Sequence, residues 1–323
     1  MTGRYLFFSA LLVFLLSACA APRVHLTPEN SLEYRVSGEG RLADYAPLFV
    51  IENPEADYNS IGSPIVTGQA DGSFAVAIDA DTPHIYAETR KWMGERGWYT
   101  NLFYRVHFSE VPMSFMPFYL TAGKNVGLLV IVTIDERDQP VLVTTLHTCG
   151  CYLAFTPTSY LDSAAFPRHW NSAQQYVYGE TLPGKLVYTG DGISKLQIML
   201  RDGVHRVMDI RLADAVAGEQ YPRKTITVQP MDSLSRLPVL PGKVMSFFET
   251  EGARKDYVRD SQKIWERLLI SWWAFDWRVG EDKRLGNKSD DGLVFYTSLK
   301  PWARTDSDLR DFPRFLRYWG WRL

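Results

Sequence analysis

Hydrophobic and polar positions divide the chain into a strand-rich part and a helical part. Between residue 32 and about residue 241, short apolar or alternating segments are separated by Gly, Asp and Pro, which is typical of strands joined by turns. Two continuous apolar runs, 126–134 and 141–146, flank a short polar loop. They predict a β-hairpin, which we expect to be central and buried because neither face offers polar side chains to solvent.

Several other segments alternate or are rich in β-branched and aromatic residues. They are residues 32–36, 73–78, 99–108, 185–189, 196–200, 207–212 and 225–228. Short strands at this regular spacing favour an antiparallel β-sandwich or a partly closed barrel.

The periodicity becomes helical after Gly242. Within residues 256–279, Ile264, Leu268, Trp272 and Phe275 recur at spacings of three and four. This pattern predicts an amphipathic helix, and we expect its apolar stripe to pack on the β-rich body.

A second helix is expected at residues 306–318, where Pro313 can kink or split it, and a strand at 293–298. The fold class that results is β-rich (α+β), with C-terminal helices packed on the strands. We divide the chain into a signal peptide (1–18), a tether (19–31), a β-rich domain (32–242) and a helical C-terminal part (243–323).

The N-terminus has the pattern of an export signal. Arg4 precedes an apolar run at 5–16 that is too short to span a bilayer, and small residues follow. The run ends in Leu-Ser-Ala-Cys at 16–19, which resembles the lipobox of bacterial lipoproteins. The resemblance implies cleavage before Cys19 and attachment of diacylglycerol to its thiol, which anchors the protein to a membrane facing the periplasm. The residue after the lipobox cysteine is Ala20 and not Asp, which under enterobacteria-like sorting implies the outer membrane.

Composition and net charge limit the classes of partner that we expect. The chain of 323 residues is 46% hydrophobic and 22% charged, as expected for a globular protein with a full core. The net charge is −2 and no basic block occurs, so we expect no nucleic-acid partner.

Tryptophans gather toward the C-terminus and have two interpretations. One is a membrane-surface belt beside the lipid anchor, and the other, which we favour, is a helix buried on the sheet. The residues concerned are Trp272, Trp273, Trp277, Trp302, Trp319 and Trp321.

The most distinctive chemistry is the sequence His-Thr-Cys-Gly-Cys at 147–151, directly after the second apolar run. If the strand continues, His147, Cys149 and Cys151 face one side. An imidazole and two thiolates form a soft ligand set suited to a transition metal such as Cu or Zn, or to haem iron. A Cys149–Cys151 disulfide, with a bend at Gly150, and two reduced core thiols are the alternatives.

Two further histidines are candidates for a fourth metal ligand. His107 lies in a segment expected to pair with the hairpin, and His205 precedes residues 207–212. The alternative for each histidine is a structural residue that binds no metal. The chain contains no GxSxG, HExxH or P-loop motif, so no catalytic residue is assigned.

These observations favour a membrane-anchored envelope lipoprotein with a metal, haem or redox site at His147, Cys149 and Cys151. The alternative is a non-catalytic envelope lipoprotein that uses its aromatic surface to bind a protein partner. A hydrolase without a recognisable motif ranks last.

Overall fold

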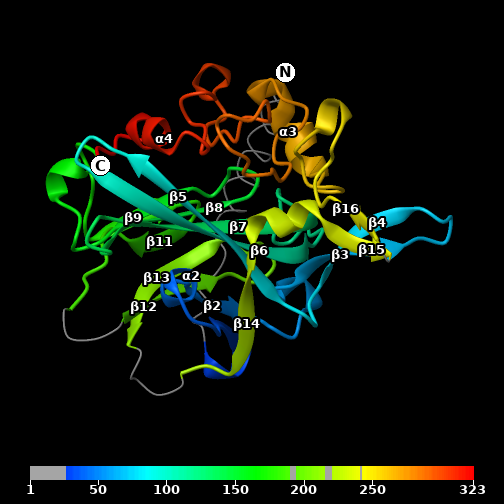
Figure 1. Cartoon of the computed structure of the whole chain (residues 1–323), viewed down its shortest axis with the longest axis horizontal. Helices are drawn as coiled ribbons and strands as arrows, with labels where there is room; N and C mark the ends of the chain where they lie inside the picture. The colour runs from blue at the N-terminus through cyan, green and yellow to red at the C-terminus, as the bar shows by residue number, and fades with distance from the viewer. Residues whose placement is uncertain (1–26, 190–193, 215–219, 241) are drawn as a thin grey trace, which may run out of the picture.

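We describe a computed structural model of the chain, covering residues 27–189, 194–214, 220–240 and 242–323. The signal peptide and the expected lipidation site Cys19 lie outside these residues. A large curled sheet forms the body, and the short C-terminal helices lie along one side of it (Figure 1). The β-rich class with C-terminal helices is therefore confirmed.

The large sheet has ten strands in the order β13-β12-β2-β1-β14-β5-β6-β7-β8-β9. It is mixed, because β1 and β2 pair in parallel with β14 and β12, and β14 pairs in parallel with β5. The strands are β1 (Ser31–Val36), β2 (Leu48–Glu52), β5 (His84–Met93), β6 (Trp98–Val111), β7 (Gly123–Ile134), β8 (Pro140–His147), β9 (Ala154–Pro157), β12 (Ser194–Leu200), β13 (Val207–Asp214) and β14 (Arg223–Pro230).

Three two-stranded sheets and short helices complete the described fold. The hairpins are β3 (Ser63–Gly68) with β4 (Phe74–Asp79), β10 (Gln174–Val177) with β11 (Glu180–Pro183), and β15 (Leu237–Leu240) with β16 (Lys243–Met245). The α-helices are α2 (Arg41–Asp44), α3 (Ile264–Ala274) and α4 (Phe312–Tyr318). The 3-10 helices are η1 (Pro28–Asn30), η2 (Asp57–Asn59), η3 (Ser163–Ala165), η4 (Met231–Ser235), η5 (Gly252–Arg254) and η6 (Pro301–Ala303).

The predicted hairpin is β7–β8, an antiparallel pair inside the large sheet. Alternate residues of β7 enter two different cores: Leu128 and Val130 join one cluster, and Leu129 and Ile131 join another that contains Phe315 of α4. Because both faces are covered, the run is apolar at every position and does not alternate.

Two predicted strands are wrong. In 185–189, Leu186 makes one isolated bridge to Thr158, and in 293–298, Tyr296 makes one to Asp308. Both segments are irregular connections in which single side chains, Leu186, Phe295 and Tyr296, are buried without a continuous ladder. The second helix is shorter than predicted, since α4 begins at Phe312 and accommodates Pro313 in its first turn.

The first C-terminal helix, α3, faces the opposite way to our prediction. Its apolar stripe points to solvent, with Ile264, Leu268 and Trp272 exposed by 55%, 61% and 71%. The buried residues of α3 are Glu266, Ser271 and Ala274. Periodicity identifies an apolar face but not the medium that covers it, so the predicted packing of the stripe on the β body is wrong.

Residues 256–263, which we expected to be helical, form turns and irregular backbone. The helix ends at Ala274, and the next residue, Phe275, caps it with a left-handed backbone of φ 50°. Among the described residues, no helix is both long and apolar enough to cross a membrane.

Candidate functional site

The candidate site is a tight turn at the end of β8. The strand ends at His147, whose carbonyl accepts from the Gly150 amide at 2.8 Å and whose amide donates to the Cys151 carbonyl at 2.9 Å. Gly150 has φ of +94°, and a Cβ at this position would lie 2.2 Å from the Tyr296 carbonyl oxygen. The turn therefore requires glycine on both conformational and steric grounds.

Cys149 and Cys151 form a disulfide across this turn, with their Cα atoms 5.6 Å apart. Of the three interpretations of the motif, this is the one that the structure contains, and Gly150 supplies the bend that it requires. Cys149 is buried, whereas Cys151 is only half-buried. The strand does not continue through the motif, so its side chains converge by the turn and not by strand alternation.

His147 completes a compact group. One nitrogen of its ring and the two sulfur atoms all lie within 4.8 Å of one another, an arrangement that can hold a metal ion when the cysteines are reduced. Nε2 of His147 lies 3.2 Å from the His205 carbonyl oxygen, which can only accept. Burial lowers the pKa of His147 to about 3, so the ring is neutral. Nε2 then carries the proton and Nδ1 keeps its lone pair.

The other two histidines do not belong to this group. His107 is buried, accepts from Arg105 Nε at 2.8 Å and packs edge-on against Phe247. Burial lowers the pKa of His107, so its ring is neutral as well. The ring of His205 stacks on Phe108 at 4.0 Å. His205 contributes its backbone carbonyl to the site.

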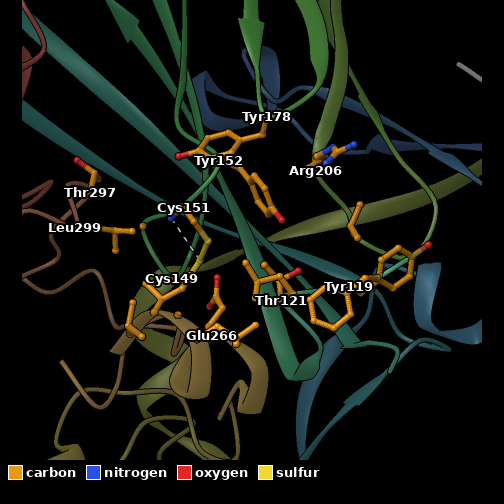
Figure 2. A pocket seen from close by; sticks show the side chains of 18 of the residues that line it. Tyr119, Thr121, Cys149, Cys151, Tyr152, Tyr178, Arg206, Glu266, Thr297 and Leu299 are labelled. Atoms are coloured by element: carbon orange, nitrogen blue, oxygen red, sulfur yellow. Dashed lines mark hydrogen bonds between the residues drawn. A yellow bond between two sulfur atoms is a disulfide. The ribbon is translucent and has the colours of Figure 1, made fainter. Parts of the chain in front are cut away.

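The disulfide lies on the wall of a cavity of about 410 Å³. The turn at 149–152, the loop at 117–121, residues 201–206, α3 and residues 296–299 enclose it. The lining is largely apolar and aromatic, and Figure 2 shows Tyr119, Tyr152 and Tyr178 around the same space as the two cysteines.

Glu266 of α3 is the unexpected member of the site. Its carboxyl group points into the cavity beside the disulfide (Figure 2), and its side chain is almost fully buried. Oε2 has no hydrogen-bond partner within the part of the chain that the structure describes. Burial raises the pKa of Glu266, an effect that Lys263 opposes. A carboxyl group whose pKa is raised holds its proton more readily than a free glutamate does, and a protonated carboxyl in this position could donate a proton to a cysteine sulfur.

Gly280 makes room for this carboxyl group. A Cβ at Gly280 would lie 1.4 Å from Oε2 of Glu266, and the backbone there has φ of +80°. The sequence signal for Glu266 is weak. In the sequence, Glu266 is a single acidic residue on the polar side of an amphipathic helix. It indicates a buried site only when the apolar side of that helix is known to face solvent.

A buried polar layer holds the turn in place. Lys263 and Asp282 form a fully buried ion pair at 3.1 Å, and Asp282 also accepts from the hydroxyl of Thr148. The ammonium of Lys283 donates to the Cys149 carbonyl at 2.6 Å. Burial lowers the pKa of Lys283 to about 8. Because these groups come from separate segments, the layer ties the turn to α3 and to the segment after it.

The chain matches no family model, no curated protein and no solved structure. What the site can do therefore rests on its own chemistry.

Proposed function

We propose that this protein is a lipid-anchored lipoprotein of the cell envelope, facing the periplasm, whose functional centre is a thiol-exchanging Cys149–Cys151 disulfide. The observation that supports it most is the position of this disulfide on the wall of an apolar cavity, beside a buried carboxyl group without a partner. Disulfides persist in the oxidising envelope, and the lipobox at 16–19 implies that location.

The exchange begins at the sulfur of Cys151, because Cys151 is the more exposed of the pair. An incoming thiolate attacks this sulfur and forms a mixed disulfide. The bond to Cys149 breaks, and the Cys149 sulfur takes the electron pair and then a proton from Glu266. A second thiolate attacks the mixed disulfide, which releases an oxidised thiol pair and leaves Cys151 as a thiolate. Two thiols are oxidised and one disulfide is reduced.

A second candidate is metal binding by the reduced pair. His147 donates from Nε2 to a backbone carbonyl, which is the arrangement that orients a metal-ligating imidazole through its other nitrogen. Nδ1 and two thiolates would suit Cu(I), Zn²⁺ or an iron cofactor such as haem. A closed tetrahedral site needs about four ligands, so the fourth would come from a molecule in the cavity.

Single cysteine variants test the exchange. In Cys149→Ser, we expect the remaining thiol of Cys151 to form a mixed disulfide rapidly with an aromatic disulfide reagent. In Cys151→Ser, the buried thiol of Cys149 should react at least tenfold more slowly in the folded protein. Equal rates, or reaction only after unfolding, would contradict the proposal.

Elemental analysis of the wild-type protein, purified without chelators, separates the two candidates. The exchange proposal predicts no stoichiometric metal and no free thiol as isolated. One metal ion per chain, lost in Cys149→Ser, Cys151→Ser and His147→Ala alike, would establish the metal site in its place.

A further inference from the structure

The outward side of α3 forms an apolar surface that no other part of the described fold covers. Seven large apolar side chains within residues 264–277 are exposed. They are Ile264, Leu268, Leu269, Trp272, Trp273, Phe275 and Trp277. Trp302 of η6 is also exposed. Arg304, directly after η6, donates to the Ala274 carbonyl and so links this segment to the end of α3.

The loop at 113–118 extends this surface. Met113, Phe115 and Met116 are exposed by 56%, 69% and 86%. Trp265 joins the loop to α3, since its indole Nε1 donates to the sulfur of Met113 at 2.9 Å and its ring lies 5.9 Å from that of Phe115. Exposed side chains of this size in one contiguous region mark an interaction site.

The helical part of this surface exposes one cation, and charges of both signs flank the surface where the loop meets the start of α3. Within residues 264–277, Glu266 is buried and Asp276 accepts from the hydroxyl of Tyr296 at 2.6 Å. The exposed charge of this stretch is Arg267, whose guanidinium lies 5.8 Å from the centre of the Trp277 ring. A short helix with aromatic and aliphatic residues outward and a cation among them has the composition of an interfacial membrane helix.

The start of the described chain is linked through two hydrogen bonds to a residue that lines the cavity. The Asn30 carbonyl accepts from the Asn53 amide, and the Asn53 side chain donates to Asp202 at 3.2 Å. Asp202 lines the cavity together with Phe118 and Leu269, which belong to the loop and to α3. Seven residues, 20–26, separate Cys19 from residue 27. They reach about 30 Å at most when extended, so a lipid on Cys19 would lie within that distance of residue 27.

We infer that the outward face of α3 and the loop at 113–118 lie on the lipid bilayer as a second contact beside the acyl anchor. The contact rests on the proposed envelope location but not on the disulfide chemistry. Because Phe118 and Leu269 line the cavity and adjoin this surface, the cavity opens close to the membrane. The surface then serves to fix the orientation of the exchange site relative to the lipid.

Vesicle binding by unlipidated protein tests this contact. The mature chain with Cys19→Ser is sedimented with vesicles of phosphatidylethanolamine and phosphatidylglycerol. We expect it to bind, and Leu268→Asp and Trp272→Asp each to reduce the partition at least tenfold. Both side chains are exposed, so far-ultraviolet circular dichroism and the thermal unfolding midpoint should show an unchanged fold. Val244→Asp alters an equally exposed apolar residue on β16 and should leave binding unchanged.

Three results would overturn the inference. The first is failure of the unlipidated chain to bind vesicles, and the second is equal loss of binding in Val244→Asp. The third is a concentration-dependent dimer that Leu268→Asp abolishes in the absence of vesicle binding, which would assign the surface to a second copy of the chain. None of these results depends on thiol exchange or on lipidation, so failure here is distinguishable from failure of the proposed function.

Discussion

At the scale of single residues, the ionisation of Glu266 links the candidate site to the stability of the fold. An unfolded glutamate has a pKa of about 4.3. In the folded protein, burial raises the pKa of Glu266, reinforced by Asp282 and opposed by Lys263 and Lys283. The fold therefore favours the neutral carboxyl. The stability that this group contributes is present below the unfolded pKa and is lost as the pH rises through the folded pKa.

Glu266→Gln isolates this effect, because the amide stays neutral at every pH. We expect the free energy of unfolding of the variant to gain on that of the wild type as the pH rises from about 4.3 through the raised pKa of the folded protein. Urea denaturation at a series of pH values measures the difference, with the surface change Glu95→Gln as control. A difference independent of pH, or one that shrinks with rising pH, would show that the fold does not favour the neutral carboxyl.

At the scale of elements, α3 packs its polar and small residues inward and leaves its apolar stripe in solvent. Its inward side carries Glu266, Ser271 and Ala274, and the last of these has no exposed surface. A small side chain at Ala274 lets the helix approach the body closely. The outward apolar side chains contribute little to folding, because they remain in solvent in both states.

Paired substitutions test this orientation. Ala274→Leu should lower the free energy of unfolding by about 1–3 kcal/mol, because a larger side chain has no space there. Leu268→Asp should change it by less than about 0.5 kcal/mol, as is usual for surface positions. Denaturant melts of the two variants give the comparison. Strong destabilisation by Leu268→Asp would mean that the stripe is buried after all.

The elements differ in how far sequence predicts them. The β7–β8 hairpin is predictable because burial on both faces leaves a continuous apolar run. The disulfide is foreseen as one of three alternatives, since Gly150 permits the bend. The burial of Glu266 in the cavity wall is not predictable, because it depends on which side of α3 faces inward, and periodicity leaves that choice open. The sequence also predicts that His147 and the two cysteines lie together, but it predicts a continuing strand as the cause. The structure brings them together by a turn.

At the scale of the whole molecule, the proposal combines an acyl anchor with an apolar surface and a cavity that adjoin each other. Lipidation at Cys19 should direct the full-length precursor to the membrane fraction. In Cys19→Ser, we expect no lipid attachment and no release of the signal, visible by mass spectrometry and metabolic labelling with a fatty acid. An unmodified mature N-terminus at another position would contradict the lipobox interpretation.

The central claim is that the Cys149–Cys151 disulfide exchanges with thiols while the protein remains folded. The most direct measurement is titration of the native protein in glutathione redox buffers, with an acid quench, alkylation and mass determination. We predict no alkylated thiol in the oxidised protein and two in the reduced protein, with unchanged near-ultraviolet circular dichroism. Two free thiols in the protein as isolated, or a disulfide that is reduced only when the protein unfolds, would contradict the account.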